Sequence, residues 1–146
     1  MIEIASPDEM FELGKRIGKQ LRTGDLVLLN GPLGAGKTLL TQGIGASLGI
    51  DGITSPTFVI SRVHRAKVNL IHVDAYRLMV AENPNLSLDD LDLDSEREDA
   101  ITVVEWGGSS AARLSEDRLE ITIDRGSETR KVSALGCGLR WEGFSL

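Results

Sequence analysis

Residues 26–48 read LVLLNGPLGAGKTLLTQGIGASL, and they give the strongest indication of the fold. Its apolar start, 26–29, predicts a strand that is buried on both faces. The glycine-rich segment 31–38 follows the strand directly. A helix is expected over 37–48, and Gly49 would end it. This order of strand, glycine-rich loop and helix predicts an α/β fold built on a parallel sheet.

The segment from Gly31 to Thr38 meets every fixed position of the Walker A pattern. Its glycines let the backbone curl, so that successive N–H groups converge on phosphate oxygens beside a helix N-terminus. Lys37 would supply an ammonium group for the outer phosphates, and the hydroxyl of Thr38 is placed to ligate Mg²⁺. We therefore expect ATP with Mg²⁺ as the ligand. The expected phosphate-binding residues are Gly31, Leu33, Gly34, Ala35, Gly36, Lys37 and Thr38.

Two acidic residues are candidates for the chemistry at this loop. Mg²⁺ on a triphosphate usually needs a carboxylate at the end of a neighbouring strand as well. Asp74 follows the strand-like run 70–73, and Glu105 follows the apolar run 101–104. Both would face the same crevice, so Asp74, Glu105 and Lys37 are the candidate catalytic residues. Chemistry alone leaves open which acid contacts the metal.

The other patterns indicate a single domain over residues 1–146. Ser6-Pro-Asp-Glu9 predicts a helix start, and apolar residues at helical spacing extend that helix to Leu21. Segment 79–98 is acidic and is expected to be mainly loop, with a short helix near 88–91. Strands are expected at 2–5, 58–63, 68–73, 101–104, 118–124 and 129–135, the last two forming a hairpin. The expected architecture is a P-loop NTPase core, with a mostly parallel sheet flanked by helices and antiparallel β additions near the C-terminus.

Composition restricts the classes of function. The 146 residues are 41% hydrophobic and 26% charged, which is typical of a globular protein. A net charge of −6 disfavours a protein that grips a nucleic-acid backbone by itself. The single cysteine, Cys137, excludes an internal disulfide and favours a reducing compartment. No secretory signal and no apolar run of about 18 residues is visible, so we expect a cytoplasmic protein without a membrane segment.

Several conspicuous residues have a structural interpretation when taken alone. Ser55-Pro-Thr-Phe58 is typical of a turn that uses the fixed φ of proline. His72, Trp106 and Trp141 are interpreted as structural residues. The basic cluster within 62–67 is expected to be a solvated hairpin tip.

Four motifs together resemble the TsaE family, formerly called YjeE, of bacterial P-loop ATPases that act in tRNA threonylcarbamoyladenosine synthesis. They have that family's order and spacing across about half of the chain. Pro32 stands where the family often has aspartate, a change that removes no group needed for phosphate binding. The motifs are the loop from Gly31, Ser55-Pro-Thr-Phe58, His72-Val-Asp-Ala-Tyr-Arg-Leu78 and Val104-Glu-Trp106.

The resemblance implies an ATPase that supports TsaB and TsaD, which modify the adenosine next to the tRNA anticodon. tRNA would be contacted only indirectly, through that complex. The resemblance also implies that Lys37 holds phosphate, that Thr38 and Glu105 ligate Mg²⁺, and that Asp74 lies near the γ-phosphate. Ser55 and Thr57 would belong to a switch segment, and Trp106 would flank the site.

Two other functions stay open. The phosphate loop alone would suit a small-molecule kinase, although the chain lacks the arginine-rich segment expected of a nucleotide-kinase lid. The acidic segment 89–99 and the net charge would suit a non-catalytic adaptor, in which ATP only orders a loop for partner binding. A Ras-like GTPase is disfavoured, because the sequence has neither an Asn-Lys-x-Asp motif nor an Asp-x-x-Gly switch.

Overall fold

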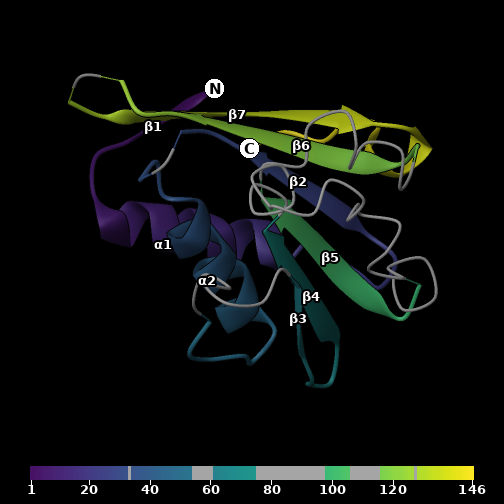
Figure 1. The fold of residues 1–146 in the computed structure, drawn as a ribbon. Coiled ribbons are helices and arrows are strands. Elements are labelled where there is room, and N and C mark those ends of the chain that lie inside the picture. The colour runs from purple at the N-terminus through teal and green to yellow at the C-terminus, as the bar shows by residue number, and fades with distance from the viewer. Residues whose placement is uncertain (33, 54–60, 75–97, 106–115, 127) are drawn as a thin grey trace, which may run out of the picture.

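The computed structural model describes residues 1–32, 34–53, 61–74, 98–105, 116–126 and 128–146. These residues form a seven-stranded sheet, two α-helices and a short 3-10 helix (Figure 1). The strands are β1 (Ile2–Ile4), β2 (Leu26–Asn30), β3 (Ser61–His64), β4 (Asn69–Asp74), β5 (Ala100–Glu105), β6 (Arg118–Asp124) and β7 (Arg130–Cys137). The helices are α1 (Pro7–Gly18), α2 (Lys37–Ser47) and η2 (Leu139–Trp141).

The centre of the sheet is parallel and its edges are antiparallel. The strand order is β1-β7-β6-β2-β5-β4-β3. Each neighbouring pair among β6, β2, β5 and β4 is parallel. β7 is antiparallel to both β6 and β1, and β3 is antiparallel to β4. Parallel strands end at the same edge, and here the register places Leu29 and Asp74 on either side of Glu105.

The predicted α/β fold and the hairpin near the C-terminus are confirmed. The expectation of a mostly parallel sheet holds only for the four central strands. β3 is antiparallel because the chain returns from His64 to Asn69 through a short turn, whereas a parallel pair needs a long crossover. The predictions for the connection around 55–58 and for segment 79–98 fall almost wholly outside the described residues.

Helices α1 and α2 lie together on one face of the sheet (Figure 1). They cross closely at two glycines. A Cβ atom on Gly14 would lie 2.2 Å from the carbonyl oxygen of Leu40, and one on Gly43 would lie 2.1 Å from that of Phe11. Any side chain there would push the helices apart. The close crossing brings the start of α2 to a fixed position over the central strands.

In the described part of the chain, no helix combines the length and the apolar character that crossing a membrane requires.

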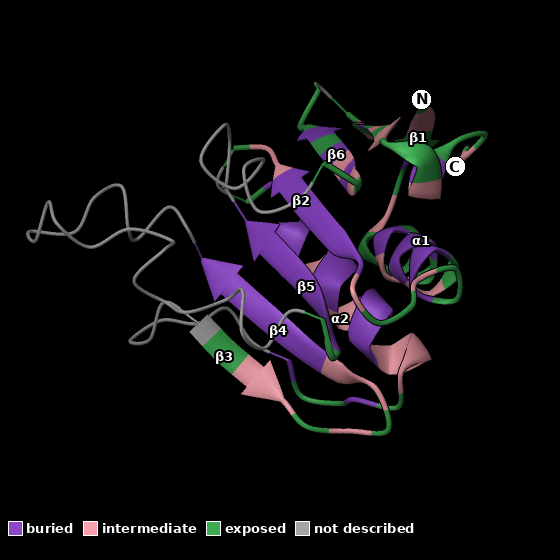
Figure 2. Cartoon of the chain, turned by 90° about the vertical axis from the view of Figure 1, so that its right-hand side faces the viewer, coloured by how far each residue is buried: buried purple, intermediate pink, exposed green. Residues whose placement is uncertain are grey.

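Strands β2, β4 and β5 are buried along almost their whole length, as Figure 2 shows. Their helix-facing side chains, such as Val27, Leu29 and Val103, pack against α1 and α2 in one apolar core. Trp141 of η2 joins this core at 3% exposure, which confirms its structural interpretation. The sheet edge β3 is more exposed (Figure 2).

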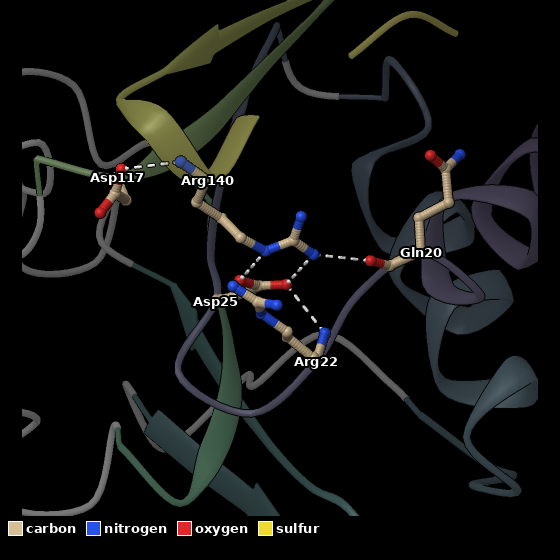
Figure 3. Close-up of polar contacts among 5 residues, drawn as sticks. All are labelled: Gln20, Arg22, Asp25, Asp117 and Arg140. Atoms are coloured by element: carbon tan, nitrogen blue, oxygen red, sulfur yellow. Dashed lines mark hydrogen bonds and ion pairs between the residues drawn. The ribbon is translucent and has the colours of Figure 1, made fainter. Parts of the chain in front are cut away.

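A partly buried ion pair ties the C-terminal segment to the start of β2 (Figure 3). The guanidinium of Arg140 donates to both carboxylate oxygens of Asp25, at 3.0 and 2.9 Å, and to the carbonyl oxygen of Gln20 at 2.8 Å. The backbone N–H of Arg22 donates to the same carboxylate, and the N–H of Arg140 donates to Asp117. Bidentate pairing of this kind fixes orientation as well as charge. It fastens the C-terminal segment at the start of β2, whereas the glycine-rich loop follows the other end of that strand.

Candidate functional site

The glycine-rich loop begins where β2 ends, at the edge of the sheet to which the parallel strands point. Gly34 and Gly36 have φ values of 78° and 113°, a region that side chains other than glycine's rarely adopt. The N–H of Ala35 donates to the carbonyl oxygen of Pro32 at 3.1 Å and closes a turn inside the loop. Leu33 lies outside the described residues. The described part of the loop therefore contains a turn and two glycines at positive φ, and it leads directly into the start of α2.

The start of α2 is left without a cap, in contrast to the start of α1. In α1 the hydroxyl of Ser6 accepts the N–H of Glu9, and the carboxylate of Glu9 accepts the N–H of Ala5. In α2 the cap residue is Gly36, which has no side chain that could accept a hydrogen bond from the first N–H groups. The first turn of α2 also contains no acidic residue. The first N–H groups and the positive end of the helix dipole are thus available to an anion.

The ammonium group of Lys37 lies against the loop itself. Its Nζ donates to the carbonyl oxygens of Gly31 and Pro32, at 2.8 and 2.9 Å. Burial lowers the pKa of Lys37 from its ordinary value, and the carboxylates of Glu105 and Asp74 oppose this shift. The two acids favour the charged form of Lys37, which is only 5% exposed. A charged ammonium group at this place can donate strong hydrogen bonds to a bound anion.

Thr38 and Glu105, the two residues expected to ligate a metal, are brought together. Oγ1 of Thr38 lies 3.4 Å from Oε1 of Glu105. Asp74 is paired in register with Glu105 on the neighbouring strand, so both acids point to the same face of the sheet. Asp74 is 8% exposed and Glu105 is 3% exposed. Two carboxylates buried to this degree would be unfavourable unless a cation balanced them.

The donor set fits Mg²⁺. This ion prefers hard oxygen ligands and usually takes only one or two protein groups, with phosphate oxygens and water filling the other positions. A hydroxyl and a carboxylate oxygen in contact at the phosphate loop meet that requirement. Among the described residues, no cluster of three or more His, Cys, Asp or Glu side chains could hold a metal by itself. Such a site would depend on the nucleotide to complete it.

Two residues at the site were not predicted. Arg130 of β7 donates from Nε to the carbonyl oxygen of Ala35 at 3.2 Å and from Nη2 to that of Gly34 at 3.3 Å. The peptide group is planar, so holding the oxygen of Ala35 turns the N–H of Gly36 to the opposite side. Arg130 therefore helps to set the direction of a loop N–H group. Its contact joins residues 95 positions apart, and no local pattern signals it.

His72 is the second residue that sequence reasoning missed, because it was interpreted as structural only. Its ring is fully buried on β4, and its Nε2 lies 3.3 Å from Oε2 of Glu105. A signal for this was present in the sequence. Side chains two positions apart on a strand share a face, so His72 lies on the same face as Asp74.

A pocket of about 300 Å³ adjoins the loop, and neither Asp74 nor Glu105 is among its lining residues. Its walls come from the β1–α1 connection, the loop backbone, Leu39 of α2 and the side chains of Glu128 and Arg130. Its volume is at the lower end of that of small-molecule sites. Ser55, Thr57 and Trp106, which were expected near the site, lie outside the described residues.

The fold and the loop define the class of protein: an α/β protein with a Walker A loop between a central parallel strand and a helix. The chain belongs to the TsaE family. The family model described as "Threonylcarbamoyl adenosine biosynthesis protein TsaE" matches residues 4–132. The resemblance seen in the four sequence motifs is thereby confirmed.

Relatives from several bacteria carry the same name. A tRNA threonylcarbamoyladenosine biosynthesis protein TsaE of Streptomyces coelicolor is 50% identical over 141 residues, which cover 90% of this chain and 93% of the relative. The protein of that name in Mycobacterium tuberculosis is 46% identical over 84% of this chain and 77% of the relative. The protein of that name in Bacillus subtilis is 35% identical over 94% of this chain and 85% of the relative. The crystal structure of Bacillus subtilis YdiB superposes with a TM-score of 0.77, at 30% identity over 97% of this chain and 87% of that one.

Proposed function

We propose that this protein binds and hydrolyses Mg·ATP in support of tRNA threonylcarbamoyladenosine synthesis. The observation that carries the proposal is the contact between Thr38 and Glu105 at a Walker A loop, in a chain of the TsaE family. The contact unites a loop-borne hydroxyl with a strand-end acid that the sequence indicated independently. It has the chemistry that a metal-bound triphosphate needs.

The triphosphate would lie over the loop and the start of α2. The uncapped N–H groups of α2 and the ammonium of Lys37 are the donors offered to it. Lys37 would exchange its bonds to the carbonyl oxygens of Gly31 and Pro32 for bonds to phosphate oxygens. Arg130 would hold the loop in the shape that presents these donors. The pocket lined by Leu39 and Glu128 gives the nucleoside a place beside the loop.

Thr38 and Glu105 would hold the metal, and Asp74 would act on water. Mg²⁺ when bound would neutralise charge that develops on the phosphate oxygens. Asp74 lies on the strand next to Glu105, near the ammonium of Lys37. As a carboxylate it would accept a hydrogen bond from a water molecule and direct the oxygen lone pair to the γ-phosphate.

The partners we propose are TsaB and TsaD, with tRNA contacted only indirectly, through their complex. The net charge of −6 supports indirect contact, because the chain offers no excess of basic groups to an RNA backbone. Family membership supports the pathway, since the matching family and its relatives are named for it. A weak ATPase when alone, active in that complex, is the form we expect.

The proposal is tested by measuring phosphate release from Mg·ATP with and without purified TsaB and TsaD. We expect slow release by the protein alone and faster release with the partners. Deletion of the gene in its host should also remove threonylcarbamoyladenosine from tRNA, as measured by mass spectrometry of nucleosides. Unchanged modification would contradict the proposal. A phosphorylated small molecule as product would instead favour a kinase, and full modification by a variant that cannot hydrolyse ATP would favour an adaptor.

A further inference from the structure

The carboxylate of Glu105 is held between two side chains, one at each oxygen. Oε1 lies 3.4 Å from the hydroxyl of Thr38, and Oε2 lies 3.3 Å from Nε2 of His72. The terminal torsion of a glutamate has a broad energy minimum, so the carboxylate plane can rotate unless its surroundings restrain it. A group at Oε2 therefore decides where Oε1 points.

The ring of His72 is buried beside the carboxylate of Glu105. Its side chain is 0% exposed, and within the described residues neither ring nitrogen has a well-aligned hydrogen bond. Its neighbours on the same face include Leu70, two positions earlier, and Val103, its register partner on β5. Both are apolar and fully buried. A polar ring is unfavourable in such surroundings unless it interacts with a polar or charged group. Arg62 is the register partner of His72 on β3, and Oε2 of Glu105 lies 3.3 Å from Nε2 of the ring.

We propose that His72 is a positioning residue, which holds Oε2 of Glu105 so that Oε1 stays directed to Thr38, where the two residues would hold a metal. The inference rests on the proposed function, because it assumes that Glu105 serves as a metal ligand. Groups that orient the ligands of a metal typically change its affinity by about 10–100-fold when they are removed. His72 would thus act on metal binding and leave the contacts of the loop with phosphate unchanged.

The test measures metal affinity separately from nucleotide affinity. Mn²⁺ is titrated into ADP-saturated protein and the free ion is followed by electron paramagnetic resonance, while ADP binding is measured by calorimetry in EDTA. We compare wild type, His72→Gln and His72→Asn. Glutamine can place its amide nitrogen near the position of Nε2, whereas asparagine reaches only the position of Nδ1. His64→Gln on β3, the other histidine of the chain, is the matched control.

We expect His72→Asn to weaken Mn²⁺ binding by about 10–100-fold, with the affinity for metal-free ADP unchanged. His72→Gln should retain most of the Mn²⁺ affinity, and His64→Gln should equal wild type. Equal Mn²⁺ affinity in His72→Asn and His72→Gln would overturn the proposal, as would a parallel loss of metal-free ADP binding. If wild type itself bound neither ADP nor Mn²⁺, the proposed function would fail before this inference was reached.

Discussion

Oγ1 of Thr38, in the first turn of α2, lies 3.4 Å from Oε1 of Glu105 at the end of β5, although 67 positions separate the two residues. The sheet makes this contact possible. β2 and β5 are parallel neighbours, so the loop that leaves β2 and the acid that ends β5 share one edge. A hydroxyl and a carboxylate that meet beside a phosphate loop are the minimum that a nucleotide-bound metal requires of a protein.

Removal of the hydroxyl of Thr38 should reduce the dependence of nucleotide binding on Mg²⁺. In Thr38→Ala we expect the gain in ADP affinity on adding Mg²⁺ to fall at least about tenfold, because one of two protein oxygens is lost from the metal. Calorimetry with Mg²⁺ and with EDTA measures this gain directly. Thr38→Ser, which keeps the hydroxyl, is the control and should behave as wild type. The same gain in the alanine variant as in wild type would show that Thr38 is no metal ligand.

Asp74→Asn should separate binding from turnover. The substitution keeps the size of the side chain but weakens the acceptor that we assign to the attacking water. We expect unchanged affinity for Mg·ADP and a loss of about 100-fold in the rate of phosphate release measured with TsaB and TsaD present. If Mg²⁺-dependent binding disappeared and Glu105→Gln only slowed turnover, the roles of the two acids would be reversed.

Arg130→Gln should weaken nucleotide binding although Arg130 lies on β7. Loss of its bonds to the carbonyl oxygens of Ala35 and Gly34 frees the loop to leave the shape that directs its N–H groups. We expect the Kd for ADP to rise about tenfold, the order of effect expected when hydrogen bonds from a charged group are lost. The matched control is Lys131→Gln, which removes the same charge from an exposed neighbour on β7. An equal effect in both variants would mean that only net charge matters.

Arg140→Ala should destabilise the fold without changing the nucleotide site. It leaves the carboxylate of Asp25, buried to 5% exposure, without its bidentate partner. We expect the free energy of unfolding in urea to fall by about 3 kcal/mol, with ADP affinity unchanged in the folded protein. Lys15→Ala breaks the exposed pair with Glu12 and should change stability by less than about 1 kcal/mol. A loss of less than about 1 kcal/mol in Arg140→Ala would show that the pair with Asp25 contributes little to stability.

The sequence could predict those parts of the site that depend on patterns of neighbouring residues. The apolar run of β2, the glycines and the helical spacing after Lys37 lie within 23 consecutive positions, 26–48, so strand, loop and helix could be placed together. Asp74 and Glu105 could be selected because each follows a strand-like run. His72 could have been added by strand parity, since it is two positions before Asp74.

The features that the sequence could not predict depend on contacts between distant segments of the chain. Arg130 reaches the loop only because β7 pairs with β6, which lies next to β2, and no spacing rule gives that order. For the same reason, the sequence did not show how much of the sheet is antiparallel at its outer strands. β1 is three residues long, and its pairing with β7 is set by strands from the other end of the chain. The crossing at Gly14 and Gly43 likewise requires both helices to be placed.

Calorimetry of wild type and Lys37→Ala with Mg·AMP-PNP would show whether the loop from Gly31 to Thr38 binds the phosphates of a nucleotide. We predict saturable one-to-one binding by wild type, weakened about 10–100-fold in Lys37→Ala through loss of a charge-assisted bond. Wild-type affinity in Lys37→Ala, or no binding by either protein, would show that this loop is not the phosphate-binding site.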